Sequence, residues 1–455
     1  MATLGLSMIA KNEAHTLRAC LNSVRDVVSQ IVIADTGCTD NTVAIAREFG
    51  ATVISVPWEN HFAKARNAAL APIKTDWVLV LDADEELDPA SKAGLPALLA
   101  APEMAGYMIT IRDYMPEKNS YYLEKAGKEN SNSPERAKAA PSYHDQRNIR
   151  LFRRNPEVYF YGRVHELVEY RICLLGLKYK PADVLIHHFG HLRGNEIRGA
   201  KALFYRELGR QKVKEEADNP FAWFELGLLE YQTFQNKDEA LACFLETVKL
   251  HPAFTRAWIF AGMIYLDSGR PFQALIALEQ AEKRDEAAGF RERLKGDAYF
   301  NLGQITQART AYQTAMKLGD DGPLVQSRLG FAEVRLGETR AGLARLQQAA
   351  EAAPHQAELH DRLVKAFLLD NDLAGAANAA EKFAECLAHP RTFLRAASIR
   401  AQLQQWDRSQ TLLSRALQMF PLSGELQNAF AEITQQKTQG VAQPAAFGAQ
   451  AGAGI

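Results

Sequence analysis

Two aspartates, Asp82 and Asp84, stand one residue apart directly after an unbroken apolar run, Trp77 to Leu81. The run has the size of a central strand buried on both faces, and the acidic residues mark where that strand ends. Side chains alternate along an extended chain, so both carboxylates project to the same side. Two such charges repel unless a cation lies between them, and all-oxygen ligation suits Mg²⁺ or Mn²⁺. The pair therefore predicts a divalent-metal site, although a solvated acidic turn would have the same sequence.

Strand and helix patterns alternate in the chain that leads to this acidic pair. The predicted strands cover residues 4–10, 30–34, 51–56 and 77–81, and the predicted helices cover residues 16–28, 43–49 and 60–70. This alternation favours right-handed βαβ crossovers and a largely parallel sheet. Ligands of such sheets bind beyond the carboxyl ends of the strands. Residues 7–12, 35–40 and 82–85 all follow those ends, which predicts one shared site.

Each of these polar segments also has a purely structural interpretation. Thr39 and Asp40 are residue types that cap helices, and Arg66 and Asn67 could be ordinary helix-surface residues. The order and spacing of the segments within one βαβαβ unit favour a site over these separate explanations. The chain contains no GxGxxG or GxxxxGK[ST] pattern, so dinucleotide-binding and P-loop sites have no support.

Four motifs in a fixed order carry a resemblance to a known family: SMIAKNE (7–13), ADTGCTDNT (34–42), WENHFAKARN (58–67) and LDADEEL (81–87). They resemble the motif series of family 2 glycosyltransferases with an α/β GT-A fold. The resemblance covers residues 3–193, and it is greatest to the bacterial branch in which tetratricopeptide repeats follow. It implies a metal-dependent, inverting transferase whose donor is a nucleotide-sugar, with a UDP-sugar as the expected one.

The resemblance also implies which residues bind the nucleotide. Asp35, at the tip of the second strand, would contact the uracil or the ribose. The end of the first strand, Ile9 to Lys11, would line the base pocket mainly through its backbone. Arg66 would reach the base or the phosphates, since a guanidinium forks well onto phosphate.

The metal ligands follow from the same resemblance. Asp84 would bind Mn²⁺ or Mg²⁺ directly, and Asp82 would share the metal or touch the ribose. The ion would bridge the diphosphate and neutralise the departing UDP. A late histidine completes the metal shell in many GT-A enzymes, and His188 matches that position best, with His165 as the alternative. A structural histidine at a packed strand end remains an equally good interpretation of His188.

An inverting transfer is a single in-line displacement, so the acceptor must lose its proton to a base. His165-Glu166 resembles the His-Glu pair that follows the second half of this family's sheet, which makes Glu166 the first candidate for the base. Glu85 is the alternative because it lies beside the metal ligands. A salt bridge with Arg163 or Arg150 is the structural alternative for Glu166.

A long polar stretch, residues 113–146, separates a predicted strand at 106–112 from another at 148–153. Loops of that length within a compact domain are usually functional lids or mobile segments. We expect an acceptor-side lid here, with plain flexibility as the alternative. The predicted glycosyltransferase domain, residues 1–193, ends soon after the last strand.

Strand patterns disappear in the second half of the chain. Residues 194–218 predict an amphipathic linker helix, and residues 219–434 show a period close to the roughly 34 residues of tetratricopeptide repeats. Small and aromatic residues recur at the signature positions, among them Trp223, Gly227, Trp258, Gly262, Gly296, Tyr312 and Gly330. No helix pair buries its apolar face alone, so such units stack into an all-α solenoid. Residues 435–455 are rich in Gln, Ala and Gly and predict a disordered tail.

The composition restricts the surroundings and partners of the protein. The charge is balanced, with 53 Lys and Arg against 54 Asp and Glu, so no basic field favours nucleic acid. Five scattered cysteines without a CxxC pair favour reduced thiols and a cytoplasmic location. The first residues do not resemble a signal peptide, and no apolar run approaches the roughly 18 residues of a membrane span. Membrane contact is therefore expected to be peripheral at most.

These observations lead to one expected function and two alternatives. The expected enzyme moves a sugar from a UDP-sugar to a hydroxyl or thiol of a protein or peptide that the repeats recruit. The first alternative is a glycosyltransferase of lipopolysaccharide or another envelope glycan. The second is a non-catalytic repeat scaffold with a relic sugar-nucleotide domain. The joint presence of Asp35, Arg66, Asp82 and Asp84 argues against a relic, which should have lost at least one of them.

Overall fold

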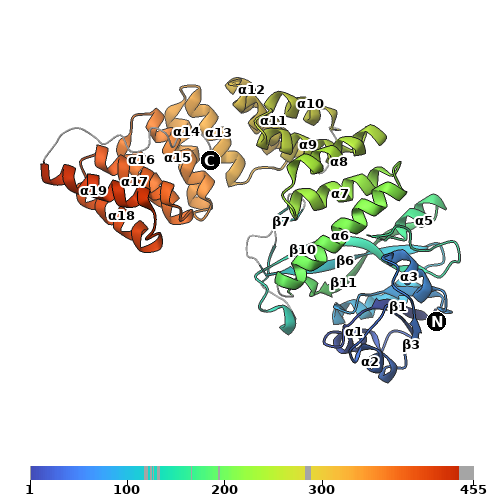
Figure 1. The fold of residues 1–455 in the computed structure, drawn as a ribbon. Coiled ribbons are helices and arrows are strands. Elements are labelled where there is room, and N and C mark those ends of the chain that lie inside the picture. Colours follow the sequence, from blue (N-terminus) through green and yellow to red (C-terminus); the bar gives the residue numbers. More distant parts are fainter. Residues whose placement is uncertain are drawn as a thin grey trace. The chain divides into compact units, whose positions relative to one another are not determined.

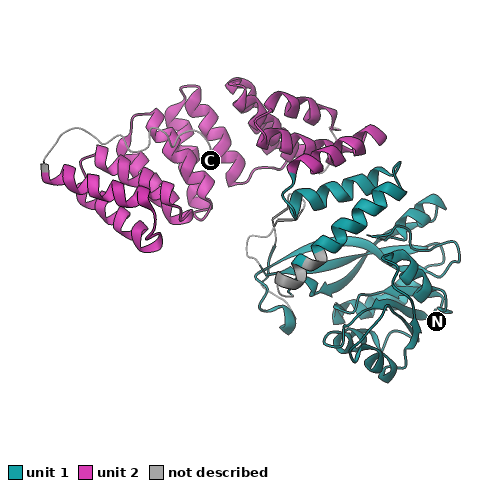
Figure 2. Cartoon of the chain, in the orientation of Figure 1, with its two compact units in different colours: residues 1–236 teal, residues 237–455 magenta. Residues whose placement is uncertain are grey.

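The computed structural model divides into two compact units, residues 1–236 and 237–455 (Figures 1 and 2). It describes residues 2–116, 121–122, 125–126, 128–130, 134–164, 166–192, 195–281 and 288–439. His165, much of the predicted lid and most of the predicted tail lie outside the described residues.

A mixed sheet forms the centre of the first unit, with nine strands among the described residues. They are β1 (Leu4–Ala10), β2 (Gln30–Asp35), β3 (Thr52–Ser55), β4 (Trp77–Val80), β5 (Glu85–Leu87), β6 (Gly106–Met115), β9 (Lys128–Glu129), β10 (Ser142–Arg153) and β11 (Tyr179–His188). Their order is β3-β2-β1-β4-β10-β6-β11-β5, and β9 pairs with β10. A separate short hairpin joins β7 (Tyr121–Tyr122) to β8 (Lys125–Ala126).

The first four strands are parallel, as the alternation of strands and helices predicts. Helices α1 (Leu17–Val24), α2 (Thr42–Glu48) and α3 (Phe62–Leu70) connect them. Strand β4 is buried along its whole length, which fits its continuous apolar sequence. Its residue Trp77 also donates a hydrogen bond from Nε1 to the Leu99 carbonyl at 3.0 Å, so that its one polar group is satisfied in the core.

The second half of the sheet is not parallel, and the prediction of a largely parallel sheet is wrong there. Strand β10 is antiparallel to β4 and to β6, and β5 is antiparallel to β11. Only the β6–β11 pair keeps the parallel direction. The reason is the connection between strands: β6 returns through β10 as a long hairpin, without the crossover helix that a parallel pair needs.

The prediction of a loop at 113–146 is also wrong at both ends of that range, where the structure has strands. Strand β6 continues to Met115, and Ser142 of β10 pairs with that residue. The extension is stable because its alternate side chains are buried: Tyr114 is fully buried and stacks on Phe189 at 5.5 Å between ring centroids. Between the strands, the short helix η2 (Glu135–Ala137) is also described.

The first unit contains six further helices among its described residues. It contains η1 (Pro89–Gly94), α4 (Leu95–Leu99), α5 (Glu169–Leu174), η3 (Gly190–Leu192), α6 (Asn195–Glu215) and α7 (Pro220–Gln232). The two last helices include residues that the sequence analysis assigned to a linker and to the first repeat. Both belong to the same compact unit as the sheet, because the units divide after Asn236.

The second unit is all-helical in its described part. It consists of α8 (Lys237–Leu250), α9 (Thr255–Asp267), α10 (Pro271–Gln280), α11 (Ala288–Asn301), α12 (Ile305–Lys317), α13 (Pro323–Arg335), α14 (Thr339–Ala352), α15 (Ala357–Leu369), α16 (Leu373–Cys386), α17 (Pro390–Gln402), α18 (Trp406–Met419) and α19 (Gly424–Gln439). Glycines let paired helices approach, as predicted: a Cβ on Gly342 would lie 2.5 Å from the Gly330 carbonyl oxygen.

Helix α19 continues past residue 434, where the sequence analysis placed the start of a disordered tail. Residues 435–439 are helical, so the tail prediction is wrong for them. Ile433 is buried in the apolar cluster that α19 shares with α17 and α18, and the amide of Gln410 donates to Thr434 Oγ1 at 2.8 Å. Lys437 also pairs with Asp407 of α18, which holds the last turn in place.

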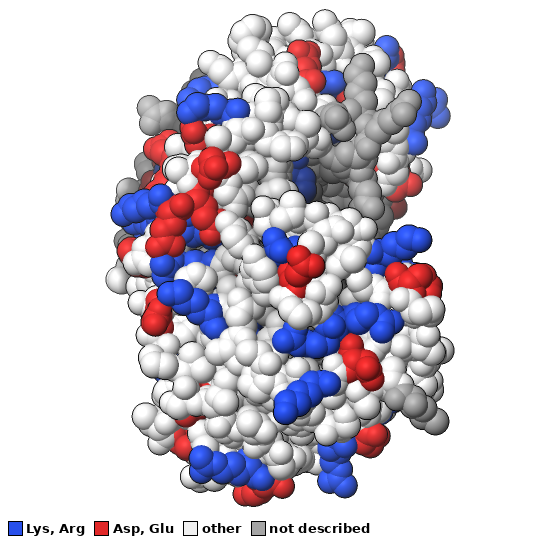
Figure 3. All heavy atoms as spheres, turned by 90° about the vertical axis from the view of Figure 1, so that its right-hand side faces the viewer, with Lys and Arg blue, Asp and Glu red and all other residues white. Residues whose placement is uncertain are grey.

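Within the described residues, no helix is both long enough and apolar enough to cross a lipid bilayer. On the face drawn in Figure 3, Lys and Arg side chains are interspersed with Asp and Glu side chains. This agrees with the balanced composition of the whole chain.

Candidate active site

The loops after β1 and β2 are joined to each other at the carboxyl end of the sheet. Asn12 has a left-handed backbone (φ 56°), and its Oδ1 accepts a hydrogen bond from the Thr39 N–H at 2.7 Å. The carboxylate of Asp35 accepts from the N–H groups of Gly37 and Cys38 at 3.0 and 2.7 Å. Burial acts to raise the pKa of Asp35, but these donors outweigh it and hold the pKa below its ordinary value.

The predicted nucleotide residues of these loops therefore lie close together. Ala10 pairs with Asp35 in the sheet, so Ile9 and Lys11 flank the residue opposite Asp35 in the β1–β2 register. Ile9 is half-buried against the apolar core, whereas Lys11 is exposed.

Arg66 lies between two carboxylates, and its side chain is only 8% exposed. Its Nη2 donates to Asp82 Oδ1 at 2.8 Å, and its Nε pairs with Glu166. Its Nη1 is buried and has no hydrogen-bond partner among the described residues. The structure thus brings Arg66, Asp82 and Glu166 together, although they come from helix α3, the end of β4 and the loop before α5.

Glu166 does form a salt bridge, but neither partner suggested by the sequence analysis is correct. Arg163 pairs with Glu215 of α6 instead, and Arg150 pairs with Glu85. The partner of Glu166 is Arg66, which is 100 residues away in the chain. An ion pair over such a distance has no local sequence signal.

Glu85 stabilises the backbone turn that carries Asp82 and Asp84. It is 1% exposed, and its Oε2 accepts the Asp82 N–H at 2.8 Å while its Oε1 accepts from Arg150 at 3.1 Å. Burial and the nearby Asp82 charge raise the pKa of Glu85 to about 7, against the opposing effect of Arg150. The pKa of Asp82 is lowered, because Arg66 and Arg150 outweigh its burial. The Glu166 side chain is 8% exposed against 2% for Glu85, so Glu166 is the less enclosed of the two candidate bases.

Asp84 faces His188 across the β5–β11 pair. The register pairs His188 with Glu85, and it leaves His188 Nε2 3.7 Å from Asp84 Oδ2. Two ligands at about 2.1 Å from one ion can be at most about 4.2 Å apart, so this spacing fits a shared Mg²⁺ or Mn²⁺. Gly190 keeps the space beside them open, because a Cβ there would lie 2.6 Å from the histidine Nε2 and 2.8 Å from the aspartate oxygen. The residues present therefore fit a divalent ion.

Two further residues of this region were missed by the sequence analysis, Asp113 and His191. Asp113 Oδ1 lies 2.5 Å from His188 Nδ1, an arrangement that orients the ring and directs Nε2 toward Asp84. One ligand atom from each of Asp113, His188 and His191 lies within 4.8 Å of the others. In the sequence, Asp113 directly follows the predicted strand at 106–112, just as Asp35 and Asp82 follow their predicted strands. This placement was the signal that could have identified Asp113.

The described part of the predicted lid contacts this region through Arg136 of η2. The Arg136 guanidinium pairs with Glu86 at 2.6 Å and lies 4.7 Å from the centre of the Phe189 ring. Glu86 lies two residues after Asp84, and Phe189 directly follows His188. The helix η2 therefore lies beside the candidate metal ligands, and a lid function for residues 113–146 stays a prediction.

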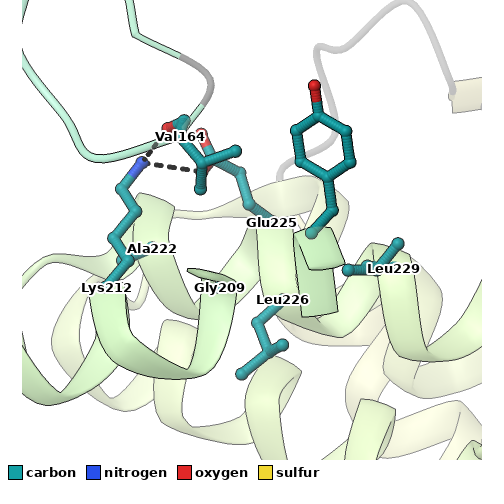
Figure 4. Close-up of a pocket in the computed structure, with 8 residues that line it drawn as sticks. Val164, Gly209, Lys212, Ala222, Glu225, Leu226 and Leu229 are labelled. Carbon is teal, nitrogen blue, oxygen red and sulfur yellow. Dashed lines mark hydrogen bonds and ion pairs between the residues drawn. The ribbon is translucent and has the colours of Figure 1, made fainter. Parts of the chain in front are cut away.

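Helix α6 supports the loop that carries Glu166. Lys212 is 4% exposed, and its Nζ donates to the Val164 carbonyl at 3.0 Å and to Glu225 of α7 at 2.8 Å (Figure 4). Tyr205 stacks on Phe62 at 5.8 Å between ring centroids. Burial, and then the Glu166 and Asp82 charges, raise the pKa of the Tyr205 hydroxyl. The predicted linker helix is thus part of the wall of the site.

Comparison with known protein families matches the two halves of the chain to different families. The model described as glycosyl transferase family 2 matches residues 6–160. Models described as tetratricopeptide repeat and tetratricopeptide repeat-like domain match residues 230–289 and 261–333.

Individual relatives cover only parts of the chain. A TPR repeat-containing protein of Synechococcus elongatus is 33% identical over 201 residues, which are 42% of this chain and 43% of that protein. The SPbeta prophage-derived glycosyltransferase SunS of Bacillus subtilis is 28% identical over 36% of this chain and 34% of its own length. A solved tetratricopeptide repeat protein from Parabacteroides merdae aligns with 52% of this chain and 94% of its own, at 12% identity and a TM-score of 0.41. The chain spans less than half the length of these two curated relatives.

Proposed function

Residues 6–160 are a glycosyl transferase family 2 domain with tetratricopeptide repeats after it, and from this premise we propose a specific reaction. The enzyme transfers a sugar, with inversion, from a UDP-sugar to a hydroxyl or thiol of a protein or peptide that the repeats recruit. The observation that carries the proposal is the convergence of Arg66, Asp82, Asp84, Glu166 and His188 beyond the carboxyl ends of the parallel strands.

In this proposal the nucleoside lies against the joined loops after β1 and β2. Ile9 and Lys11 line the base through their backbone, and Asp35 accepts from the uracil or the ribose. Its carboxylate is already fixed by the Gly37 and Cys38 N–H groups, so it does not need to be ordered when the nucleotide binds.

Asp84 and His188 are the proposed ligands of a divalent ion, with Asp82 beside them. When bound, such an ion supplies the positive charge that neutralises the departing diphosphate. Asp113 holds the His188 ring in its orientation. Arg66 keeps the Asp82 carboxylate in place through its Nη2 contact, which supports the turn that presents Asp84.

Glu166 is the proposed base that takes the proton from the acceptor. Its carboxylate is held by Arg66 on one side, and the Lys212 contact with Val164 fixes its loop on the other. A base fixed in this way is positioned before the acceptor arrives, which lowers the barrier of an in-line displacement.

One feature of the surface favours a second candidate, the envelope-glycan glycosyltransferase. Tyr159, Tyr161, Tyr170 and Leu174 are exposed, and the rings of Tyr161 and Tyr170 stack at 4.9 Å. Tyr161 lies on the same loop as Glu166. Tyrosines and apolar residues at such a place suit the boundary between water and lipid, where a lipid-linked acceptor would present its sugar.

The proposed reaction predicts slow donor hydrolysis without any acceptor. The full-length protein is incubated with separate UDP-sugars and Mn²⁺, and the release of UDP is measured. We expect one donor to release UDP well above the others, and we expect EDTA to stop the release. No release from any donor, together with no Mn²⁺-dependent binding of UDP, would favour the non-catalytic scaffold.

Replacing Lys212 by methionine is expected to slow transfer about tenfold, because the loop that carries Glu166 loses its anchor on α6. Lys212 touches neither donor nor acceptor in this proposal, so the loss should fall on kcat and leave the KM for the donor nearly unchanged. Lys214→Met on the exposed face of the same helix is the matched control. Unchanged kcat in the Lys212 variant would show that the loop is held without this contact.

A further inference from the structure

The second unit contains a groove with a volume of about 540 Å³. It is lined by side chains of α9, α11, α12, α13 and α15, so it crosses several successive helical pairs of the solenoid. None of the residues that the structure describes in the first unit contributes to it. A groove of this size lies within the range of about 300 to 1,000 Å³ that is typical of ligand sites, so it has room for several side chains of a bound segment.

The apolar part of the groove is aromatic. Phe290 and Phe300 of α11 and Phe331 of α13 line it, and all three are half-buried. The rings of Phe300 and Phe331 have centroids 5.5 Å apart and are tilted by 34°. Flat rings that stay partly exposed in a concave surface are suited to contacts with apolar side chains of a ligand.

The polar part of the groove is a continuous chain of ion pairs. Asp297 accepts from the Tyr312 hydroxyl at 2.8 Å and from Arg328 Nε at 2.6 Å. Arg328 Nη2 lies 3.3 Å from Glu358 Oε1, and the same oxygen accepts from Arg362 Nη2 at 2.5 Å. The network therefore alternates anion and cation across three helices.

Two donors of this network lack a partner among the described residues. Asp297 and Glu358 each accept two donors on one oxygen, and Asp361 pairs with both Lys365 and Arg395. The Nη1 atoms of Arg328 and Arg362 are instead buried without a hydrogen-bond partner in the part of the chain that the structure describes. A ligand that supplies acceptor oxygens would satisfy donors that the protein leaves unsatisfied.

The two arginines differ in how far the protein stabilises their charge. Burial, and then the neighbouring Arg328 guanidinium, lower the pKa of Arg362. Burial also acts to lower the pKa of Arg328, but Asp297 and Glu358 outweigh it and raise that pKa. An added anion beside Arg362 would therefore stabilise a charge that its own carboxylate partner does not fully compensate.

We propose that this groove binds an extended peptide segment that carries an acidic side chain. The carboxylate pairs with Arg328 and Arg362, and neighbouring apolar side chains lie against Phe300 and Phe331. The assignment deepens the proposed function, on which it rests, by giving the chemistry of the segment through which the repeats recruit a protein acceptor.

The charges of the groove select this occupant over a polyanion. Asp297, Glu358 and Asp361 line the groove together with the arginines, so a nucleic-acid backbone would meet a carboxylate at each step. A peptide brings one isolated negative charge between uncharged backbone units, which matches the alternation. The groove also crosses several helices, which suits a segment passing through it more than a chain end.

The test is an array of eight-residue peptides with amidated ends, each made in a Glu version and an isosteric Gln version, and probed with the labelled full-length chain. We expect the Glu versions to bind at least tenfold better, with the preference weakening at high salt. Arg362→Gln should lose that preference. Arg309→Gln, which removes a surface arginine of α12 paired with Glu338, is the matched control and should keep it.

A variant expected to gain affinity separates binding from damage to the fold. Glu358→Gln removes the carboxylate that Arg328 and Arg362 share, so we expect acidic peptides to bind several-fold more tightly. Equal binding of Glu and Gln versions, or weaker binding by Glu358→Gln, would each overturn the proposal.

Donor hydrolysis, measured on the same preparations, tests the proposed transferase activity separately from the assignment of the groove. Normal UDP release without any preference for acidic peptides contradicts the groove assignment alone. A clear preference that Arg362→Gln abolishes, in a chain that releases no UDP, supports the groove and contradicts the proposed transferase.

Discussion

Replacing Asp84 by alanine is expected to abolish the Mn²⁺-dependent binding of UDP and to leave the fold intact. Asp84 Oδ2 and His188 Nε2 are 3.7 Å apart beside the open space at Gly190, so both are placed to bind one ion. A single histidine would not hold a hard divalent cation against water without the carboxylate. Because diphosphate affinity depends on that ion in the proposed site, loss of the ion should remove most of the UDP affinity.

The measurement is calorimetric titration of UDP into each protein, with Mn²⁺ and with EDTA. Asp183→Ala is the matched control, because it removes an exposed aspartate from the same strand, β11, that carries His188. We expect the control to bind UDP like the unaltered chain. If the Asp84 variant still binds UDP in a Mn²⁺-dependent way, Asp84 is not a metal ligand, and Asp113 with His188 and His191 becomes the candidate cluster.

The sequence predicts strands β1 to β4 well, because each of them depends on a short local sequence pattern. Strands β1 to β4 each follow from a short apolar run, and right-handed connections then fix their parallel order. Asp35, Asp82 and Asp84 could be assigned to one edge because the carboxyl ends of parallel strands meet there. No knowledge of distant contacts was needed for that step.

The parts that could not be predicted depend on pairings between distant segments. Asp113 was taken as a loop residue, because the polar sequence of β6 and β10 hides an alternation in which Tyr114 is buried. The Arg66–Glu166 ion pair joins residues in different elements, and either residue alone is indistinguishable from a surface residue. The ion pair has no motif that could have revealed it, and the one signal for Asp113 was its place directly after the predicted strand at 106–112.

Helix α6 shows the same limit for domain boundaries. Its amphipathic sequence is typical of a connector, and its charged residues suggest solvent exposure. Lys212 is nevertheless buried, since its amine is satisfied by the Val164 carbonyl and by Glu225. Burial of a lysine depends on partners that are distant in the chain, and α6 belongs to the same compact unit as the sheet.

Replacing Glu166 by glutamine is expected to reduce transfer by roughly 10²-fold or more, and to leave donor binding nearly unchanged. Glutamine has the shape of glutamate but cannot take a proton from the acceptor. Arg66 should stay in place, because its Nη2 keeps the Asp82 contact at 2.8 Å when the Nε partner becomes neutral. The loss should therefore appear in kcat with acceptor present, and not in the affinity for UDP.

Two further variants decide what such a loss means. Glu157→Gln removes an exposed glutamate near the same loop and should transfer sugar at the normal rate. Glu85→Gln should instead weaken the structure of the turn at 82–85, because that carboxylate accepts the Asp82 N–H and an Arg150 donor. The opposite result has two parts: Glu166→Gln transfers normally, and Glu85→Gln loses transfer while it binds UDP as before. In that case the base is the buried Glu85, whose pKa is raised. The Arg66–Glu166 pair then only positions Asp82.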